Sequence, residues 1–338
     1  MAMPLHPRIP FPWAVIGAGA WGTALADTLA HAGNPVVVWD RDPLVTDDIT
    51  RNHANRKRYP EGLVHPSLTA TTQFEEAVKG THAIMLAVPS EAHEYIATQL
   101  KAHLAPHQAL VLGAKGFRER DGRLLSHLWQ EAFPENPVMV LSGPTFAAEL
   151  MAHSMTACVL AGRDEELRAG LAHSMMTPWF KVYETQDLIG VQVGGALKNV
   201  LAIAAGMLDG LEMGLNARAA LLTRGIAEMG RLAKALGGED QTLYGLAGVG
   251  DLLLTATSTL SRNYRFGVMV GKGVAVPEAK LRLGTVEGVL AARIATVQGQ
   301  SLGVDLSIIA ALDGILHGDV APLQALEYLM LQPRELER

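Results

Sequence analysis

Residues 14–42 read AVIGAGAWGTALADTLAHAGNPVVVWDRD, and this stretch decides the fold of the first half of the chain. An apolar run, a glycine-rich turn, a helical segment and a second apolar run follow one another. Gly17, Gly19 and Gly22 form the pattern G-x-G-x-x-G where the first run meets the helical segment. Such a turn bends tightly, lets a pyrophosphate approach bare backbone and packs the helix closely on the strand. With Gly33 as a helix stop, this context predicts a dinucleotide-binding strand–helix–strand unit.

The residue at the end of the second apolar run bears on which dinucleotide is bound. Asp40 follows Gly22 by 18 residues, a position from which a carboxylate can hydrogen-bond the hydroxyls of the adenosine ribose. This carboxylate favours NAD, because it would repel the 2′-phosphate of NADP. The neighbouring Arg41 could attract that phosphate, stack on the adenine or simply remain solvated. The residues therefore leave both NAD and NADP open.

The rest of the first half continues the same alternation. Apolar runs at 83–88, 109–112 and 138–141 are typical of strands that are buried on both faces of a sheet. Helical segments such as 92–103 separate several of these runs. Repetition of strand, helix and strand predicts a parallel sheet with right-handed crossovers. We therefore expect residues 1–188 to form a Rossmann-type dinucleotide-binding domain with a mainly parallel sheet.

The second half loses the strand pattern and carries apolar residues at helical spacing. We expect residues 189–338 to form an all-α domain for substrate binding and catalysis. The expected helical segments are 194–211, 216–236, 245–260, 286–298, 305–316 and 322–331.

Composition narrows the class of protein. The chain has 338 residues, enough for about two domains, and 49% of them are hydrophobic. A net charge of −6 argues against binding to nucleic acid. The single Cys158 cannot form an internal disulfide, and no signal peptide or membrane-spanning segment is expected, which favours the cytoplasm. The twelve histidines show no metal-ligand spacing, so we expect no metal.

One apolar helical segment carries an unexpected cation. Residues 194–206 read GGALKNVLAIAAG, with Lys198 and Asn199 in the middle. Side chains lean toward the N-terminus of a helix, so the amine should lie over Gly194 and Gly195, which leave an open shelf for a bound molecule. The alternative is a lysine that reaches solvent along an apolar face.

Polar residues in four other segments are candidates for the same site. Asp251 and Thr255 share one helical face, although Asp251 could simply cap the helix. The triplet 261–263, Ser-Arg-Asn, offers a hydroxyl, a guanidinium fork and an amide, which suit a phosphate. Lys115 and the segment 142–145 each follow a strand, where the ligand crevice of a parallel sheet lies.

Seven motifs in order resemble the NAD(P)-dependent glycerol-3-phosphate dehydrogenases of bacteria, over about residues 13–330. They are G-A-G-x-W-G-T-A-L, A-K-G-F, S-G-P-T-F-A-x-E, G-x-Q-x-G-G-A-x-K-N-V, G-x-x-G-x-G-D-L-x-x-T, S-R-N-x-x-F-G and V-E-G. The resemblance implies a Rossmann domain and a helical domain with the active site between them, a homodimer, and a role in supplying glycerol phosphate for phospholipids. One departure is Thr285, two residues before Glu287, where a more apolar residue is usual in the family.

The resemblance also implies roles for individual residues. Lys198 matches the proton acceptor, and Lys115, Asn199 and Asp251 accompany it as catalytic candidates. The substrate set is Lys115, Gly143, Thr145, Lys198, Asp251, Thr255, Ser261, Arg262 and Asn263. The cofactor set includes the glycines of the turn and Asp40. Its members are Gly17, Gly19, Ala20, Trp21, Gly22, Asp40, Arg41, Lys115, Ala147, Arg262 and Glu287.

The expected reaction interconverts sn-glycerol 3-phosphate and dihydroxyacetone phosphate. Lys198 would polarise the carbonyl and protonate the alkoxide, and Asn199 would add a neutral donor. Two alternatives stay open at this stage. A 3-hydroxy acid or 6-phosphogluconate type dehydrogenase shares the two-domain plan and a Lys-Asn pair, and a non-catalytic dinucleotide sensor could retain the glycine-rich turn.

Overall fold

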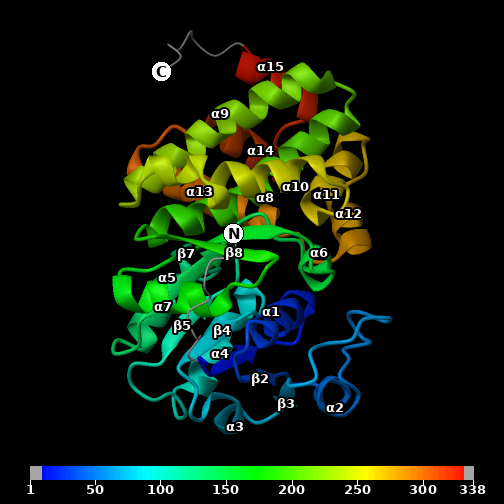
Figure 1. The fold of residues 1–338 in the computed structure, drawn as a ribbon. Helices are drawn as coiled ribbons and strands as arrows, with labels where there is room; N and C mark the ends of the chain where they lie inside the picture. The colour runs from blue at the N-terminus through cyan, green and yellow to red at the C-terminus, as the bar shows by residue number, and fades with distance from the viewer. Residues whose placement is uncertain (1–9, 331–338) are drawn as a thin grey trace, which may run out of the picture. The chain divides into compact units, whose positions relative to one another are not determined.

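The computed structural model describes residues 10–330, which form two compact units. Unit 1 comprises the described residues within Met1–Arg118 and Arg123–Leu188. Unit 2 comprises Glu119–Gly122 and the described residues within Ile189–Arg338. Unit 1 combines a sheet with helices, whereas unit 2 is helical (Figure 1). The predicted fold class, a Rossmann-type α/β half followed by an all-α half, is therefore confirmed.

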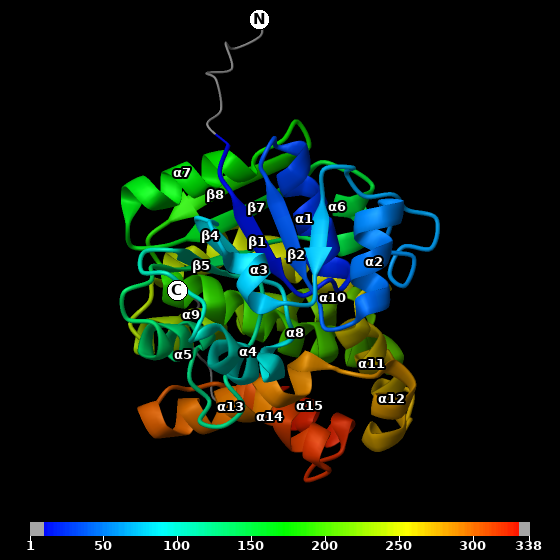
Figure 2. The ribbon, with the colours of Figure 1, turned by 90° about the horizontal axis from the view of Figure 1, so that it is seen from below.

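The sheet of unit 1 has eight strands in the order β3-β2-β1-β4-β5-β6-β7-β8. All neighbouring strands are parallel except β6 and β7, which are antiparallel. The strand order reverses at β1, which lies between β2 and β4 (Figure 2). In open α/β sheets a dinucleotide binds at such a reversal. The strands are β1 (Trp13–Ile16), β2 (Val36–Trp39), β3 (Thr69–Thr71), β4 (Ala83–Leu86), β5 (Ala109–Leu112), β6 (Val138–Ser142), β7 (Thr156–Ala161) and β8 (Phe180–Thr185).

Burial explains which strands the apolar pattern reveals. Every residue of β1, β4 and β5 is buried, so these strands read as continuous apolar runs. Sequence analysis misses β3, β7 and β8. The edge strand β8, FKVYET, alternates buried and exposed positions over its first four residues, and β3 has only three residues. Edge strands lack the long apolar runs on which the prediction relied.

Helices surround this sheet. The first helix, α1 (Ala20–His31), begins directly after Gly19, so Gly22 lies in its first turn. The others are α2 (Pro43–Asn52), α3 (Phe74–Val78), α4 (His93–Leu100), α5 (Leu125–Ala132), α6 (Ala147–Met151) and α7 (Glu165–Met175).

Unit 2 is built around α8 (Leu188–Gly210), which contains Lys198 and Asn199. The other helices are α9 (Gly214–Ala235), α10 (Asp251–Thr257), α11 (Arg262–Gly271), α12 (Val276–Leu283), α13 (Glu287–Leu302), α14 (Ser307–His317) and α15 (Pro322–Met330); a π-helical turn, Leu246–Gly250, precedes α10. The sequence did not reveal α11 and α12. The last residue of the expected segment 322–331 lies outside the described residues.

The length and composition of α8 bear on the expectation that no segment spans a membrane. Despite its lysine and asparagine, α8 is long and apolar enough to cross a membrane by length and composition, and it is the one such helix in the described part of the chain. However, 94% of the apolar window is buried inside the protein. The apolar character of α8 is therefore explained by its position in the protein core.

Glycines allow α8 and α11 to approach each other closely. A Cβ atom on Gly206 would overlap the carbonyl oxygen of Tyr264, and one on Gly267 would overlap that of Ile203. The spacing G-x-x-x-G occurs on both helices, at Gly206–Gly210 and at Gly267–Gly271, so the two backbones meet without intervening side chains. This contact positions the start of α11 beside the middle of α8.

Candidate active site

The glycine-rich turn of unit 1 has the shape of a pyrophosphate cradle. Gly17 has a φ of +105°, a conformation that L side chains rarely adopt, and a Cβ on Gly22 would overlap the carbonyl oxygen of Gly17. A Cβ on Gly19 would meet nothing within 4 Å. The first N–H groups of α1 have no partner within the helix and carry its partial positive charge. The open side at Gly19 therefore fits a dinucleotide phosphate.

Polar side chains brace this turn. The Asp40 carboxylate accepts a hydrogen bond from the backbone N–H of Ala18 at 2.8 Å, so it supports the turn as well as being the expected ribose ligand. Asn55 is 1% exposed and donates to the Ala18 carbonyl and to the Thr23 hydroxyl, at 3.0 and 2.8 Å. The sequence analysis missed Asn55, because it lies in a segment without a periodic pattern.

Tyr59, which the sequence analysis also missed, connects the starts of two helices. Its hydroxyl donates to the carbonyl oxygen of Ala20 at 2.8 Å and also lies 3.3 Å from the carbonyl oxygen of Ala147. Burial, assisted by the charge of Asp27, raises the pKa of Tyr59 to about 12, which keeps the hydroxyl protonated as a donor. Tyr59 therefore holds together two residues that are expected to contact the cofactor.

The remaining cofactor candidates of unit 1 differ in exposure. Trp21 donates from Nε1 to the carbonyl of Gly113 at 3.1 Å, which ties α1 to the end of β5. Arg41 is exposed at the end of β2, where it can meet the adenosine end of a dinucleotide. The exposure of Arg41 leaves the choice between NAD and NADP open.

A lysine and two neighbours meet beyond the carboxyl ends of adjacent strands β5 and β6. Lys115 donates from Nζ to the carbonyl of Gly143 at 2.9 Å and lies 3.4 Å from the Thr145 hydroxyl. Gly143 has a φ of +141°, and a Cβ there would lie 2.9 Å from the Cα of Cys158. Burial raises the pKa of the Cys158 thiol, so it is an inert packing group. The structure therefore brings Lys115, Gly143 and Thr145 together.

In unit 2, Lys198 lies at the centre of a buried polar group. Its ammonium pairs with the carboxylate of Asp251 and donates to the Thr255 hydroxyl at 3.0 Å. Lys198 is 7% exposed and Asp251 is fully buried. Lys198 therefore does not extend into solvent. Nor does Asp251 cap a helix: it is the first residue of α10, after Gly250 at the cap position, and its carboxylate faces the lysine.

The prediction of open space for a ligand beside Lys198 is wrong at Gly194. A Cβ on Gly194 would lie 2.5 Å from the carbonyl oxygen of Ala247, in the π-helical turn before α10. The missing side chain therefore admits backbone rather than a ligand. This contact holds α8 against the segment that carries Asp251, so Gly194 serves the lysine by positioning its carboxylate partner.

Asn199 begins a second chain of hydrogen bonds. Its Nδ2 donates to the carboxylate of Glu287 at 3.1 Å, and its Oδ1 accepts from Nδ2 of Asn263 at 2.9 Å. The Oδ1 of Asn263 in turn accepts from the backbone N–H of Gly288 at 3.1 Å. The amide of Asn263 thus joins α8 to the start of α13. Thr285, where the chain departs from the family pattern, is exposed, so the change leaves the core packing intact.

The start of α11 carries the expected phosphate ligands. Ser261 caps this helix by accepting a hydrogen bond from the Tyr264 N–H at 3.2 Å. Arg262 is exposed and forms no ion pair with a carboxylate of residues 10–330. A helix N-terminus beside an uncompensated guanidinium favours an anion.

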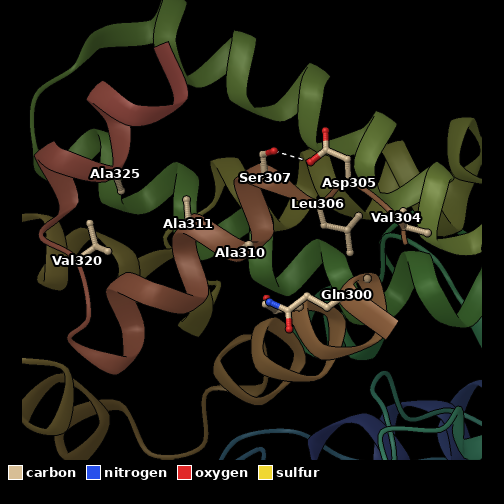
Figure 3. A pocket seen from close by; sticks show the side chains of 11 residues that line it. Gln300, Val304, Asp305, Leu306, Ser307, Ala310, Ala311, Val320 and Ala325 are labelled. Atoms are coloured by element: carbon tan, nitrogen blue, oxygen red, sulfur yellow. Dashed lines mark hydrogen bonds between the residues drawn. The ribbon is translucent and has the colours of Figure 1, made fainter. Parts of the chain in front are cut away.

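A separate cavity lies elsewhere in unit 2. It has a volume of about 540 Å³, and Figure 3 shows residues around it. The polar groups shown include Gln300, Asp305 and Ser307, and the Ser307 hydroxyl bonds to the Asp305 carboxylate at 2.5 Å. No lysine or arginine lines the cavity to neutralise a phosphate, and it includes none of the predicted site residues. The lining is Thr296, Gly299, Gln300, Val304, Asp305, Leu306, Ser307, Ala310, Ala311, Val320 and Ala325.

Two family models cover most of the chain. The model of the NAD-dependent glycerol-3-phosphate dehydrogenase N-terminus matches residues 12–168, and that of the C-terminus of the same family matches residues 187–327. Together they span the glycine-rich turn, the lysine of α8 and the start of α11. This match favours the glycerol-3-phosphate dehydrogenases over the hydroxy acid type and over a non-catalytic sensor.

Individual relatives agree with these models. The glycerol-3-phosphate dehydrogenase [NAD(P)+] of Xanthomonas oryzae pv. oryzae is 42% identical over 328 residues, which cover 96% of either chain. The Rhodospirillum rubrum enzyme of the same name is 41% identical and covers 96% of this chain and 93% of its own. A crystal structure of glycerol-3-phosphate dehydrogenase from Coxiella burnetii has a TM-score of 0.89 and 36% identity, covering 96% of this chain and 99% of its own. The chain therefore belongs to the NAD-dependent glycerol-3-phosphate dehydrogenase family and, with it, to the oxidoreductases that use NAD(P).

Proposed function

We propose that the protein interconverts sn-glycerol 3-phosphate and dihydroxyacetone phosphate, with Lys198 as the group that exchanges the proton. The observation that carries the proposal is the buried group of Lys198, Asp251 and Thr255 in a chain of this family. Surface lysines are mobile, whereas this amine is held by a carboxylate and a hydroxyl. An oriented amine can serve as general acid in one direction and as general base in the other.

The proposed chemistry assigns each step to a residue of this chain. In reduction, the Lys198 ammonium hydrogen-bonds to the carbonyl oxygen and then gives its proton to the alkoxide. In oxidation, the neutral amine takes the hydroxyl proton, and Asp251 stabilises the ammonium that forms. The nicotinamide, when bound, donates or accepts the hydride. Asn199, held by Asn263 and Glu287, positions the substrate oxygen.

Unit 1 is proposed to hold the dinucleotide. The open backbone at Gly19 and the start of α1 fit the pyrophosphate, and the remaining assignments follow the family resemblance. Residues proposed to contact the cofactor are Gly17, Gly19, Ala20, Trp21, Gly22, Asp40, Arg41, Lys115, Ala147, Arg262 and Glu287. In this division of tasks, most cofactor ligands lie before residue 189, with Arg262 and Glu287 as exceptions, and the proton donor and the phosphate ligands lie from 189 onward.

The phosphate and the carbon chain of the substrate are proposed to meet polar groups of both units. Arg262 and the capped start of α11 favour the phosphate, since this guanidinium pairs with no carboxylate within residues 10–330. The proposed substrate ligands are Lys115, Gly143, Thr145, Lys198, Asp251, Thr255, Ser261, Arg262 and Asn263.

Three cellular aspects follow from the family resemblance. We propose a homodimer, a cytoplasmic location and a role in supplying the glycerol phosphate backbone of phospholipids. The apolar helix α8 fits this location because it is buried in the protein. Light scattering of the purified protein tests the dimer, and complementation of a bacterium that requires glycerol tests the role.

Consumption of NADH and of NADPH with dihydroxyacetone phosphate tests the activity directly. Lys198→Ala should lower turnover about a hundredfold to ten-thousandfold, the usual contribution of a general acid or base, while NADH binding survives. Lys234→Ala, which removes an exposed lysine of α9, is the matched control and should leave turnover unchanged.

Truncation of Lys198 leaves Asp251 as a buried, unpaired charge, which destabilises the fold. The double variant Lys198→Met/Asp251→Asn removes that charge and provides a folded reference, checked by circular dichroism. If a folded variant without the amine keeps wild-type turnover, Lys198 is not the proton donor.

A further inference from the structure

Three ionisable side chains converge on unit 1, apart from every residue assigned above. Asp27 and His31 lie one turn apart on α1, and His153 follows α6. The Asp27 Oδ2 lies 3.1 Å from Nε2 of His153 and 3.7 Å from Nε2 of His31. All three atoms lie within 4.8 Å of one another. One carboxylate oxygen and two imidazole nitrogens, all atoms that can bind a metal ion, therefore lie close together.

The two separations from Asp27 match those of ligands around one metal ion. Zn–N and Zn–O distances of about 2.0–2.2 Å in a tetrahedral site place neighbouring ligand atoms roughly 3.3 Å apart. The Asp27–His153 and Asp27–His31 distances bracket this value. A small cation can therefore replace the direct contacts after only minor side-chain movement.

Neighbouring groups hold the three ligands in position. Asp27 is 1% exposed, and its Oδ1 accepts a hydrogen bond from the His65 N–H at 2.7 Å, which aims Oδ2 at the imidazoles. The His153 ring stacks on Trp179 with centroids 4.2 Å apart, and the His31 ring meets Trp179 edge-on at 5.4 Å. Such outer contacts orient ligands in metal sites.

The imidazoles are also suited chemically. Imidazole nitrogens and carboxylate oxygens are common ligands of divalent transition metals. His31 and His153 are exposed, so an ion can enter from solvent and a water molecule can complete the coordination.

We propose that Asp27, His31 and His153 bind a divalent transition-metal ion, with Zn²⁺ as the best match to two imidazoles and one carboxylate. The ion joins the last turns of α1 to the chain beyond α6, and so stabilises the helix that begins at the glycine-rich turn. It takes no part in hydride transfer, since none of its ligands belongs to the proposed cofactor or substrate set. The site is independent of the proposed function.

Titration of the untagged, metal-free full chain with Zn²⁺ by calorimetry tests this proposal. The expected result is one equivalent bound per chain and a higher melting temperature. Co²⁺ in place of Zn²⁺ should give the visible absorption bands of a four-coordinate site. His31→Gln and His153→Gln should each weaken binding at least about tenfold, the loss typical when one contact to a metal is removed.

The matched control is His103→Gln, which removes an exposed histidine elsewhere on unit 1 and should leave binding unchanged. The histidine variants are chosen because their side chains are partly exposed, whereas Asp27 is needed for packing. Unchanged NADH binding verifies their fold. The proposal fails if wild type binds no stoichiometric Zn²⁺, or if the double variant His31→Gln/His153→Gln binds it as tightly.

Discussion

At the residue scale, the arginine at the start of α11 shows how position determines what a charge can do. Arg262 is exposed and pairs with no carboxylate of residues 10–330, whereas Arg218 in the same unit is paired with Asp209. A paired guanidinium is neutralised by its partner. Arg262 keeps its full charge for a ligand, beside the N–H groups of a helix capped by Ser261.

This position leads to a prediction for Arg262→Ala. A charge-assisted hydrogen bond contributes about 1.5–3 kcal/mol, so the variant should raise the KM for dihydroxyacetone phosphate at least about tenfold. Its rate with unphosphorylated dihydroxyacetone should change little. Steady-state kinetics with both substrates make the comparison, and Arg265→Ala, an exposed neighbour on the same helix, is the control. Equal losses with both substrates would remove Arg262 from the phosphate site.

At the scale of elements, close helix packing produces the polar network of unit 2. The glycines of α8 and α11 let the two backbones touch, and this brings Asn263 within 2.9 Å of Asn199. Glycine weakens an isolated helix by about 1 kcal/mol relative to alanine. The contact offsets that loss, which is why α11, RNYRFGVMVG, tolerates Gly267 and Gly271.

The packing predicts opposite effects for two glycine substitutions. Gly267→Ala adds a Cβ that overlaps the carbonyl of Ile203, so it should destabilise the protein and lower turnover by moving Asn263. Gly230→Ala, in α9, meets nothing closer than 3.5 Å and should preserve or raise stability by up to about 1 kcal/mol. Urea unfolding and steady-state turnover measure both effects. Wild-type stability and turnover in Gly267→Ala would show that the helices adapt freely.

At the scale of the whole molecule, binding tasks are proposed to be divided between two units. The cofactor set includes Arg262 and Glu287, which start α11 and α13 in unit 2, as well as residues of the glycine-rich turn in unit 1. Hydrogen exchange on adding NADH should therefore slow in residues 17–23 and also in the first turns of α11 and α13. Helices α7 and α14 serve as internal controls. Protection confined to unit 1 would remove Arg262 and Glu287 from the cofactor set.

The local pattern of apolar residues and glycines was sufficient to predict the central part of the Rossmann-type fold. The strands β2 and β5 and the turn at Gly17–Gly22 coincide with the expected segments, and β1 lies one residue earlier, because full burial and tight backbone geometry act on neighbouring residues. The order of motifs identified the family, which the comparisons confirm. The sequence by itself thus determined the Rossmann turn, the helical second half and the family, and it singled out Lys198 as a candidate for the active site.

Tertiary structure alone decided the partners of those residues. Lys198 and Asp251 are 53 positions apart, and Asn199 and Glu287 are 88 apart, so no local period signals their pairing. It also showed that Gly194 admits backbone rather than ligand, and that Asp27 and His153, 126 positions apart, face each other. The physical reason is that periodicity reports only which side of an element is buried. Which groups then meet depends on how closely the helices and strands pack.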